Sequence, residues 1–297
     1  MLAEVIRHLE PRAGGRYIDC TVGGAGYTIA LAQVAGRTGK IIGIDQDELA
    51  ITHAREEISL RKLENIILVR DNFKNLKTIV TDLAATGQID GRGFDGIVFD
   101  LGLSSAQLDD ETRGFSFKGD RPLDMAFGPE SLRRTTDIVN RYPHGELARI
   151  FRELGEERRA GRLASAILEA RRKKRLATTG DLVGVIEGVL PVRAGSRIHP
   201  ATKVFQALRM ETNGELETLL QVLPAATNLL APRGRLVVVS FHSGEDRIVK
   251  RFLKGDSHLQ ILTKRPLVPT ESETATNPRA RSAKLRAALK LDNFQKE

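Results

Sequence analysis

The stretch "YIDCTVGGAGYT" (17–28) decides the fold, because an apolar run that ends at Asp19 is followed at once by a cluster of glycines. Glycines at 23, 24 and 26 allow the chain to turn tightly and another molecule to approach its backbone. The residues that follow, "YTIALAQVA", have apolar side chains at helical spacing. A strand, a glycine loop and a helix in this order predict a nucleotide site at the end of the strand.

The same alternation continues outward from this stretch. Apolar runs predict strands at 16–20, 40–45, 65–71 and 95–100, and helical patterns lie between them. Strand–helix alternation specifies a parallel sheet with helices on both faces. We therefore expect an α/β fold.

The alternation stops after the fourth strand. From about 107 to 205 the pattern indicates loops and amphipathic helices. It resumes with a helical stretch, "GELETLLQVLPAATNLLAPRG", in which we expect Pro224 to separate two helices. A strand follows at 235–241, and 258–270 with 283–290 predict a final antiparallel pair. We expect one domain in two parts, 1–106 and 206–297, interrupted by a helical insertion at 107–205.

The composition is that of an ordinary globular protein, with 41% hydrophobic and 28% charged residues among 297. No apolar run has membrane-spanning length, and the N-terminus carries charges too early for a secretory signal. The single cysteine, Cys20, excludes a disulfide framework and a Cys-x-x-Cys zinc site. No His/Asp cluster has metal spacing. We expect a cytoplasmic protein without a metal or a membrane.

The net charge of +8 favours a polyanionic partner. The basic residues form separate clusters: Arg158, Arg159 and Arg162; the run at 171–175; and Arg279, Arg281, Lys284 and Arg286. A solvated surface is the alternative for any one run. Several clusters in one chain favour nucleic acid, and the insertion is the expected RNA-recognition domain.

The glycine loop lacks the features of the two commonest nucleotide motifs. A dinucleotide fingerprint would need a third glycine where Ile29 stands, and no lysine follows the loop as in a phosphate-binding loop. The remaining pattern suits a ligand with carboxylate and amino groups, such as S-adenosylmethionine. Asp45 ends the second strand, where a carboxylate accepts ribose hydroxyls. NAD-dependent enzymes also bind ribose with an acid at this strand end, so a nicotinamide-dependent oxidoreductase is an alternative at this point.

Four acids, Asp19, Asp45, Asp71 and Asp100, lie at predicted strand ends. In open α/β sheets, ligands bind outside this carboxyl edge. Each acid alone is also a suitable helix N-cap. Together they favour a binding cleft.

Longer motifs carry a resemblance to a known family: "FDLGLSSAQLDD", "RGFSFKGDRPLDM", "GEERRAGRLASAILEAR", "HPATKVFQALR", "LAPRGRLVVVSFHSGEDRIVKRF" and "NPRARSAKLR". Nearly the whole chain resembles the bacterial ribosomal RNA small-subunit methyltransferase H (MraW) family. The resemblance implies a class I, Rossmann-like methyltransferase fold with an antiparallel C-terminal strand. It implies methyl transfer from S-adenosylmethionine to the exocyclic N4 of a cytidine in the decoding region of 16S rRNA, in the small subunit or a late precursor. A monomer and a homodimer are both compatible with it. The alternative is a non-catalytic RNA-binding assembly factor with a vestigial pocket.

The family's site residues carry over by position. The resemblance implies cofactor contacts from Ala25, Gly26, Tyr27, Asp45, Phe73, Asp100 and Gln107. Many amino-methyltransferases have an acid or amide at the strand end that Asp100 occupies, followed by two prolines that this chain lacks. We assign Asp100 to the cofactor first, and its catalytic role in orienting the amine is a second expectation. The commoner family loop has Gly, His and Gly where this chain has Ala25, Tyr27 and Cys20. The family's histidine-containing lead-in before "MLAEV" is missing, which indicates lost residues or a misassigned start.

Several other residues have two open interpretations. Phe115 and Phe117 offer either a stacking surface for a flipped base or an anchor of the insertion to the core. His242 follows a strand end and either faces the cleft or is structural. His199 precedes Pro200 and indicates a helix start. We interpret Cys20 as packing within the loop.

Overall fold

The structure, a computed structural model, describes residues 1–103, 110, 112–117, 119–128, 131, 133–192 and 199–292. The chain divides into a first unit, Met1–Ser104 with Leu216–Glu297, and a second unit, Ser105–Glu215. The expected boundary at 205 falls inside α10 (Ala201–Asn213), a continuous helix of the second unit.

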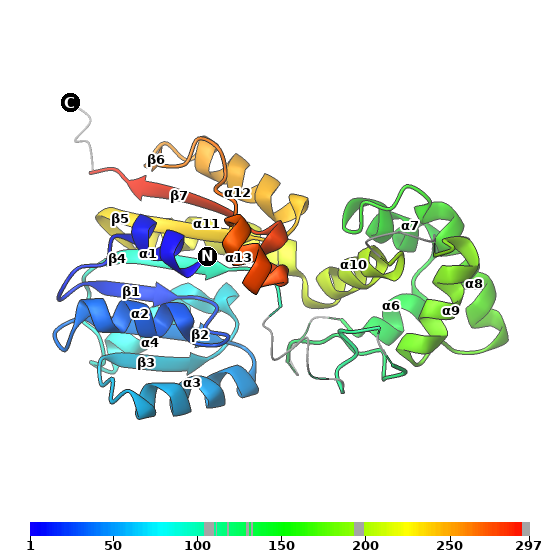
Figure 1. Cartoon of the computed structure of the whole chain (residues 1–297), viewed down its shortest axis with the longest axis horizontal. Coiled ribbons are helices and arrows are strands. Elements are labelled where there is room, and N and C mark those ends of the chain that lie inside the picture. Colours follow the sequence, from blue (N-terminus) through cyan, green and yellow to red (C-terminus); the bar gives the residue numbers. More distant parts are fainter. Residues whose placement is uncertain are drawn as a thin grey trace. The chain divides into compact units, whose positions relative to one another are not determined.

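A seven-stranded sheet in the order β3-β2-β1-β4-β5-β7-β6 forms the centre of the first unit (Figure 1). The strands are β1 (Arg16–Asp19), β2 (Lys40–Asp45), β3 (Ile66–Arg70), β4 (Phe94–Asp100), β5 (Leu230–Ser240), β6 (Leu259–Ile261) and β7 (Lys284–Lys290). Strands β1 to β5 pair in parallel, whereas β7 is antiparallel to both β5 and β6. The expected Rossmann-like sheet with an antiparallel C-terminal strand is confirmed.

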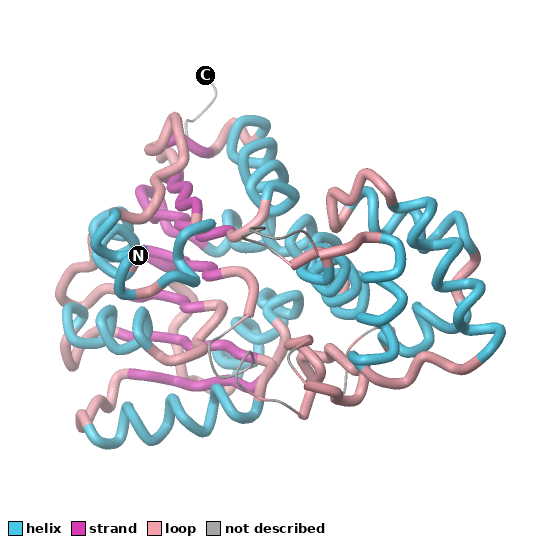
Figure 2. The backbone as a smooth tube through the Cα atoms, turned by 45° about the vertical axis from the view of Figure 1, so that its right-hand side comes forward, coloured by secondary structure: helices cyan, strands magenta, loops and turns pink. Residues whose placement is uncertain are grey.

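Helices cover both faces of this sheet, so its inner strands are buried on both sides (Figure 2). Because side chains alternate along a strand, Tyr17 packs on one face of the sheet and Ile18 packs on the other. One face carries α1 (Leu2–Leu9), α2 (Gly26–Ala35) and α3 (Glu48–Leu60); the other carries α4 (Leu76–Ala85), α11 (Glu215–Leu229) and α12 (Ser243–Gly255). Shorter elements are η1 (Phe73–Asn75), α13 (Glu271–Thr276) and η2 (Pro278–Ser282).

Helix α11 continues through Pro224, so the expectation of two helices is wrong. Proline has no N–H to bond the carbonyl of Leu220, four residues earlier. Both residues are exposed, and Leu220 is 57% accessible. Water can therefore solvate the freed carbonyl, and the helix is not interrupted.

The described part of the second unit is built from helices and loops, as expected (Figure 2). The helices are α6 (Thr135–Arg141), α7 (His144–Glu153), α8 (Ala160–Lys173), α9 (Thr179–Val189) and α10. In α8, Leu163, Ala164 and Ile167 are buried on one face, as their spacing predicts. Among the described residues, no helix of either unit has the length and apolar character needed to cross a membrane.

Candidate active site

The glycine loop joins β1 to α2 and contains two residues in the left-handed region. Gly23 has φ 47°, and Ala25, the N-cap of α2, has φ 60°. An L-residue with a side chain adopts this region at a cost in free energy, whereas glycine does not. A glycine at position 25 would therefore fit the same backbone without strain.

Gly24 and Gly26 have no such backbone requirement. Neither has a positive φ, and no atom of the described residues lies within 4 Å of a Cβ added to either. Packing within the chain therefore does not demand glycine at these positions. Two glycines that face open space leave room for a ligand directly against the loop backbone.

Asp19 is fully buried and fixes this loop. Its carboxylate accepts the Thr21 N–H at 3.1 Å and the Thr28 hydroxyl at 2.6 Å. Burial raises the pKa of Asp19 to about 6. The neighbouring Cys20 is buried in the core under α4 and α11, and burial raises the pKa of its thiol. Its packing role is confirmed.

Asp45 ends β2 and connects that strand to the glycine loop. Its Oδ2 accepts the Gly23 N–H and its Oδ1 accepts the Asp47 N–H, both at 2.9 Å. Burial raises the pKa of Asp45. Because each carboxylate oxygen has two lone pairs, Asp45 keeps the capacity to accept two further hydrogen bonds. The residue fits a pair of ribose hydroxyls.

Asp100 ends β4 beside the loop. Its backbone N–H donates to the Thr21 hydroxyl at 2.7 Å, and Tyr27 donates a hydrogen bond to its carboxylate. Burial and the charge of Asp19 raise the pKa of Asp100 to about 7. Burial, followed by the charge of Asp100, raises the pKa of Tyr27.

One oxygen of Asp100 has no hydrogen-bond partner among the described residues. Its Oδ1 is buried and accepts no hydrogen bond from any described residue. A buried acceptor without a donor destabilises a protein by about 1–3 kcal/mol. A ligand with a charged amino group would satisfy this oxygen, so the residues present fit S-adenosylmethionine.

Phe73 lies in η1, directly after β3, and is partly exposed. It packs edge to face with Phe99 of β4, with ring centroids 5.6 Å apart and ring planes at 83°. An aromatic ring in this place suits an adenine base.

The strand-end acids are not the N-caps of the described helices that follow their strands. The N-caps are Ala25 for α2, Asp47 for α3 and Asn72 for η1. Asp71 is engaged locally, since it accepts hydrogen bonds from Asn72 and Asn75. The structure brings Asp19, Tyr27 and Asp100 together. Gln107 lies outside the described residues.

Residues 1–291 match the MraW methylase family. The chain belongs to this family. Membership confirms the resemblance drawn from the motifs and makes the chain a methyltransferase that uses S-adenosylmethionine.

Curated relatives of the MraW family are similar over nearly their whole length. The ribosomal RNA small subunit methyltransferase H of Heliobacterium modesticaldum is 43% identical over 310 residues, covering 98% of this chain and 97% of that protein. The protein of the same name from Carboxydothermus hydrogenoformans is 41% identical over 309 residues, covering 98% and 96%. Among solved structures, an rRNA methylase from Streptococcus thermophilus matches with a TM-score of 0.46 and 13% identity, covering 98% of this chain and 92% of that one.

The two aromatic residues of the MraW motif "RGFSFKGD" pack within the second unit. Phe115 is buried against Phe127, with centroids 5.7 Å apart. The ring of Phe117 stacks on that of His199, with centroids 4.9 Å apart, and meets the ring of Phe205 edge to face, with centroids 5.4 Å apart. His199 also accepts the Ala201 N–H at 3.1 Å, so it marks the start of α10 as expected.

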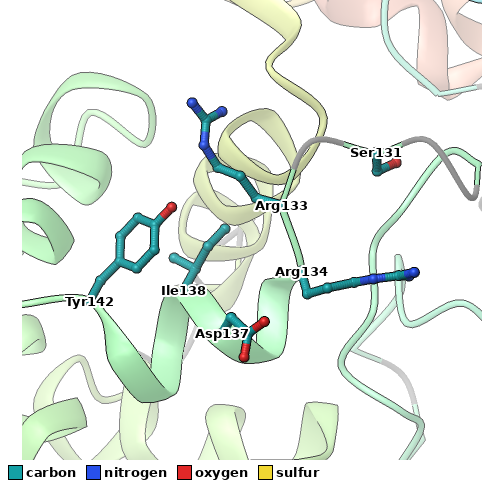
Figure 3. A pocket seen from close by; sticks show the side chains of 6 residues that line it. All are labelled: Ser131, Arg133, Arg134, Asp137, Ile138 and Tyr142. Atoms are coloured by element: carbon teal, nitrogen blue, oxygen red, sulfur yellow. The ribbon is translucent and has the colours of Figure 1, made fainter.

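A cavity of about 310 Å³ lies in the second unit around the start of α6 (Figure 3). It is lined by Ser131, Arg133, Arg134, Asp137, Ile138 and Tyr142. Arg133 is paired with Glu211 at 3.4 Å, and Arg134 lies 3.6 Å from Asp124. Its arginines are already partnered, and it contains none of the predicted cofactor residues.

The basic run at 171–175 is not a uniform surface. Arg171 donates to the carbonyls of Val139 and Tyr142, at 3.0 and 2.8 Å. Lys173 and Lys174 pair with Glu169 and Asp181, at 3.1 and 2.8 Å. In the first unit, Arg286 is likewise buried and paired with Asp246 at 2.6 Å. These residues have structural partners, which the sequence did not reveal.

Proposed function

We propose that this chain transfers a methyl group from S-adenosylmethionine to the exocyclic N4 of a cytidine in the decoding region of 16S rRNA. Its substrate is the small ribosomal subunit or a late precursor, which places the enzyme in the cytoplasm. Full-length similarity to small-subunit rRNA methyltransferases supports the substrate class. The observation that carries the proposal is the buried, unpartnered Oδ1 of Asp100 at the end of β4, as found among the described residues.

The cofactor is held by the glycine loop and three strand ends. Ala25, Gly26 and Tyr27 form the surface against which its methionine part lies, and Asp45 accepts the ribose hydroxyls. Phe73 packs on the adenine, with Gln107 as a further contact. When bound, the cofactor supplies a methyl group on a sulfonium, which is its own leaving group.

The chain's own contribution to the chemistry is alignment. The amine of cytosine is a poor nucleophile because its lone pair is conjugated with the ring. Oδ1 of Asp100 has two lone pairs, so beside the cofactor's amino group it can also accept an N–H of this amine. That contact orients the nitrogen toward the methyl group, an effect of position and electrostatics. The target base must leave its stack to reach this site.

Nucleoside analysis of methylated rRNA tests the proposal. Small subunits from cells that lack the protein are incubated with purified enzyme and labelled S-adenosylmethionine. We expect label in N4-methylcytidine at one position. Asp100→Asn keeps the shape of the side chain, and we expect about a hundredfold lower turnover at saturating cofactor. Label in another nucleoside, or none in any, would refute the proposed reaction. Parental turnover of Asp100→Asn would refute only the orienting role.

A further inference from the structure

His242 follows β5 directly and is the N-cap of α12. Its ring Nδ1 accepts the backbone N–H groups of Gly244 at 3.2 Å and Glu245 at 3.3 Å. A ring nitrogen that accepts hydrogen bonds carries no proton. The neutral ring therefore carries its hydrogen on Nε2, which is a donor.

No described residue accepts a hydrogen bond from this donor. Nε2 is buried and makes no hydrogen bond within the described part of the chain. Glu245 Oε1 lies 3.0 Å from it but does not meet hydrogen-bond geometry, so the contact is only electrostatic. The other oxygen of Glu245 accepts the N–H groups of Phe241 and His242, at 2.8 and 3.3 Å.

Helix capping explains Nδ1 but not Nε2. Asparagine, aspartate and serine are the preferred N-caps, and each would supply the acceptor without a second ring nitrogen. A histidine adds a buried donor that is unfavourable unless something accepts from it. A residue that is less than optimal for stability indicates a function.

His242 lies at the strand end next to that of Asp100. β5 is the parallel neighbour of β4, and Asp100 pairs with Val239 in the register. The charge of Glu245 also reaches Asp100, where it contributes to the raised pKa. In the described residues of the first unit, the buried side-chain atoms without hydrogen-bond partners are Asp100 Oδ1 and His242 Nε2. An acceptor and a donor therefore lie at adjacent strand ends.

Cytosine presents the complementary pair on one edge. Its N4 amine donates hydrogen bonds, and the ring nitrogen N3 beside it accepts one. We propose that His242 Nε2–H donates to N3 of the target cytosine and thereby determines base specificity. This inference rests on the proposed function. Uracil carries a hydrogen on N3, so its N3–H donor would face the Nε2–H donor of His242. Because Nε2 is buried in this structure, the groups that cover it must move when the base enters.

Two substitutions separate the ring nitrogens. His242→Asn keeps an acceptor near the position of Nδ1 and removes the distal donor, whereas His242→Gln keeps an amide N–H near the position of Nε2. Each variant is the control for the other. The measurements are kcat and KM for small subunits, affinity for S-adenosylmethionine, and inhibition by the same RNA with uridine at the target position.

We expect His242→Asn to lower kcat/KM for RNA about tenfold, the effect of one lost base contact. The affinity of this variant for S-adenosylmethionine should equal that of the parent. Its inhibition constant for the uridine RNA should equal its dissociation constant for the cytidine RNA. His242→Gln should restore most of the discrimination. Parental discrimination in His242→Asn would overturn the proposal. Equal losses in both variants, together with lower melting temperatures, would show a helix cap only. Failure of the parental enzyme to methylate cytidine would instead refute the proposed function.

Discussion

Asp19 and Asp100 are two buried carboxylic acids at neighbouring strand ends, and burial raises their pKa values to about 6 and about 7. The charge of Asp45 also raises the pKa of Asp19, and the charge of Asp19 also raises that of Asp100. In the unfolded chain both would titrate near pH 4. Between these values, the folded, cofactor-free protein holds protons that the unfolded chain has released. As pH rises, the stability of the folded protein should therefore fall, whereas its affinity for a positively charged ligand group should rise.

The melting temperature of the cofactor-free protein should fall as pH rises from 5 to 8. The stabilisation from the neutral acids is complete below about pH 4 and is lost as pH rises through the folded pKa values of about 6 and 7. Asp100→Asn should melt higher than the parent at pH 8 and show a flatter profile. Thermal melts at constant ionic strength measure this. Parallel profiles for both proteins would contradict it.

Affinity for S-adenosylmethionine should increase as pH rises through about 7, the pKa of Asp100. The reason is that, in the proposed site, the cofactor's amino group pairs with the ionised form of this carboxylate. Binding at pH 6.5, which lies below this pKa, should release a proton. Calorimetry in two buffers of different ionisation enthalpy measures that release. In Asp100→Asn, we expect weaker binding and no proton release assigned to this group. An unchanged proton count would remove Asp100 from the cofactor site.

The sequence predicted the positions of Asp45 and Asp100 because acids at strand ends follow from the strand pattern alone. It did not predict that the Thr21 hydroxyl would hold the backbone of Asp100, since the two residues are far apart in the chain. Nor does "SFHSGEDR" reveal the unpartnered nitrogen of His242. Hydrogen bonds between distant residues depend on side-chain geometry, which periodicity does not contain.

Helix α8 ends in a basic run whose members have different roles. Arg171 bonds two carbonyls at the end of α6, whereas Arg172 and Arg175 are exposed and make no ion pair within the described residues. The run therefore combines a structural arginine with residues available for phosphate.

Arg172→Ala with Arg175→Ala should weaken RNA binding and reduce its salt slope by about two, one for each lost phosphate contact. Arg171→Ala should instead lower the free energy of unfolding by about 1–3 kcal/mol, because two carbonyls lose their donor. Filter binding at several salt concentrations and denaturant melts measure both. If the double variant kept the parental slope, these residues would be merely solvated.

Pro224→Ala should stabilise α11. Alanine restores the hydrogen bond to Leu220 and has a helix propensity about 3 kcal/mol better than proline, although it also gives the unfolded chain more freedom. We expect a net gain of about 1–2 kcal/mol in the free energy of unfolding, with parental cofactor affinity. Urea unfolding measures it. A loss of stability would mean that the proline fits this helix better than alanine does.

At the scale of the whole molecule, the proposed cofactor residues Asp45, Phe73 and Asp100 all come from the first unit. If residues 105–215 are replaced by a short Gly/Ser linker, the remaining protein should bind S-adenosylmethionine within about tenfold of the parent, because it loses only the contact proposed for Gln107. Methylation of small subunits should be lost. Calorimetry and the labelling assay measure the two properties. Retained methylation would contradict RNA recognition by the insertion.

The interruption of the first unit has a consequence for its folding. β4 ends at Asp100 and β5 begins at Leu230, yet these strands are parallel neighbours in the sheet. During synthesis, β4 emerges well before its partner, so the nascent chain exposes an apolar sheet edge to other chains. Closing a long loop is also slow, since non-local pairing must first overcome chain entropy. The intervening helices make local contacts and fold sooner. Once they fold, fewer free residues separate the two strands, so the order of synthesis favours an early insertion and a late sheet.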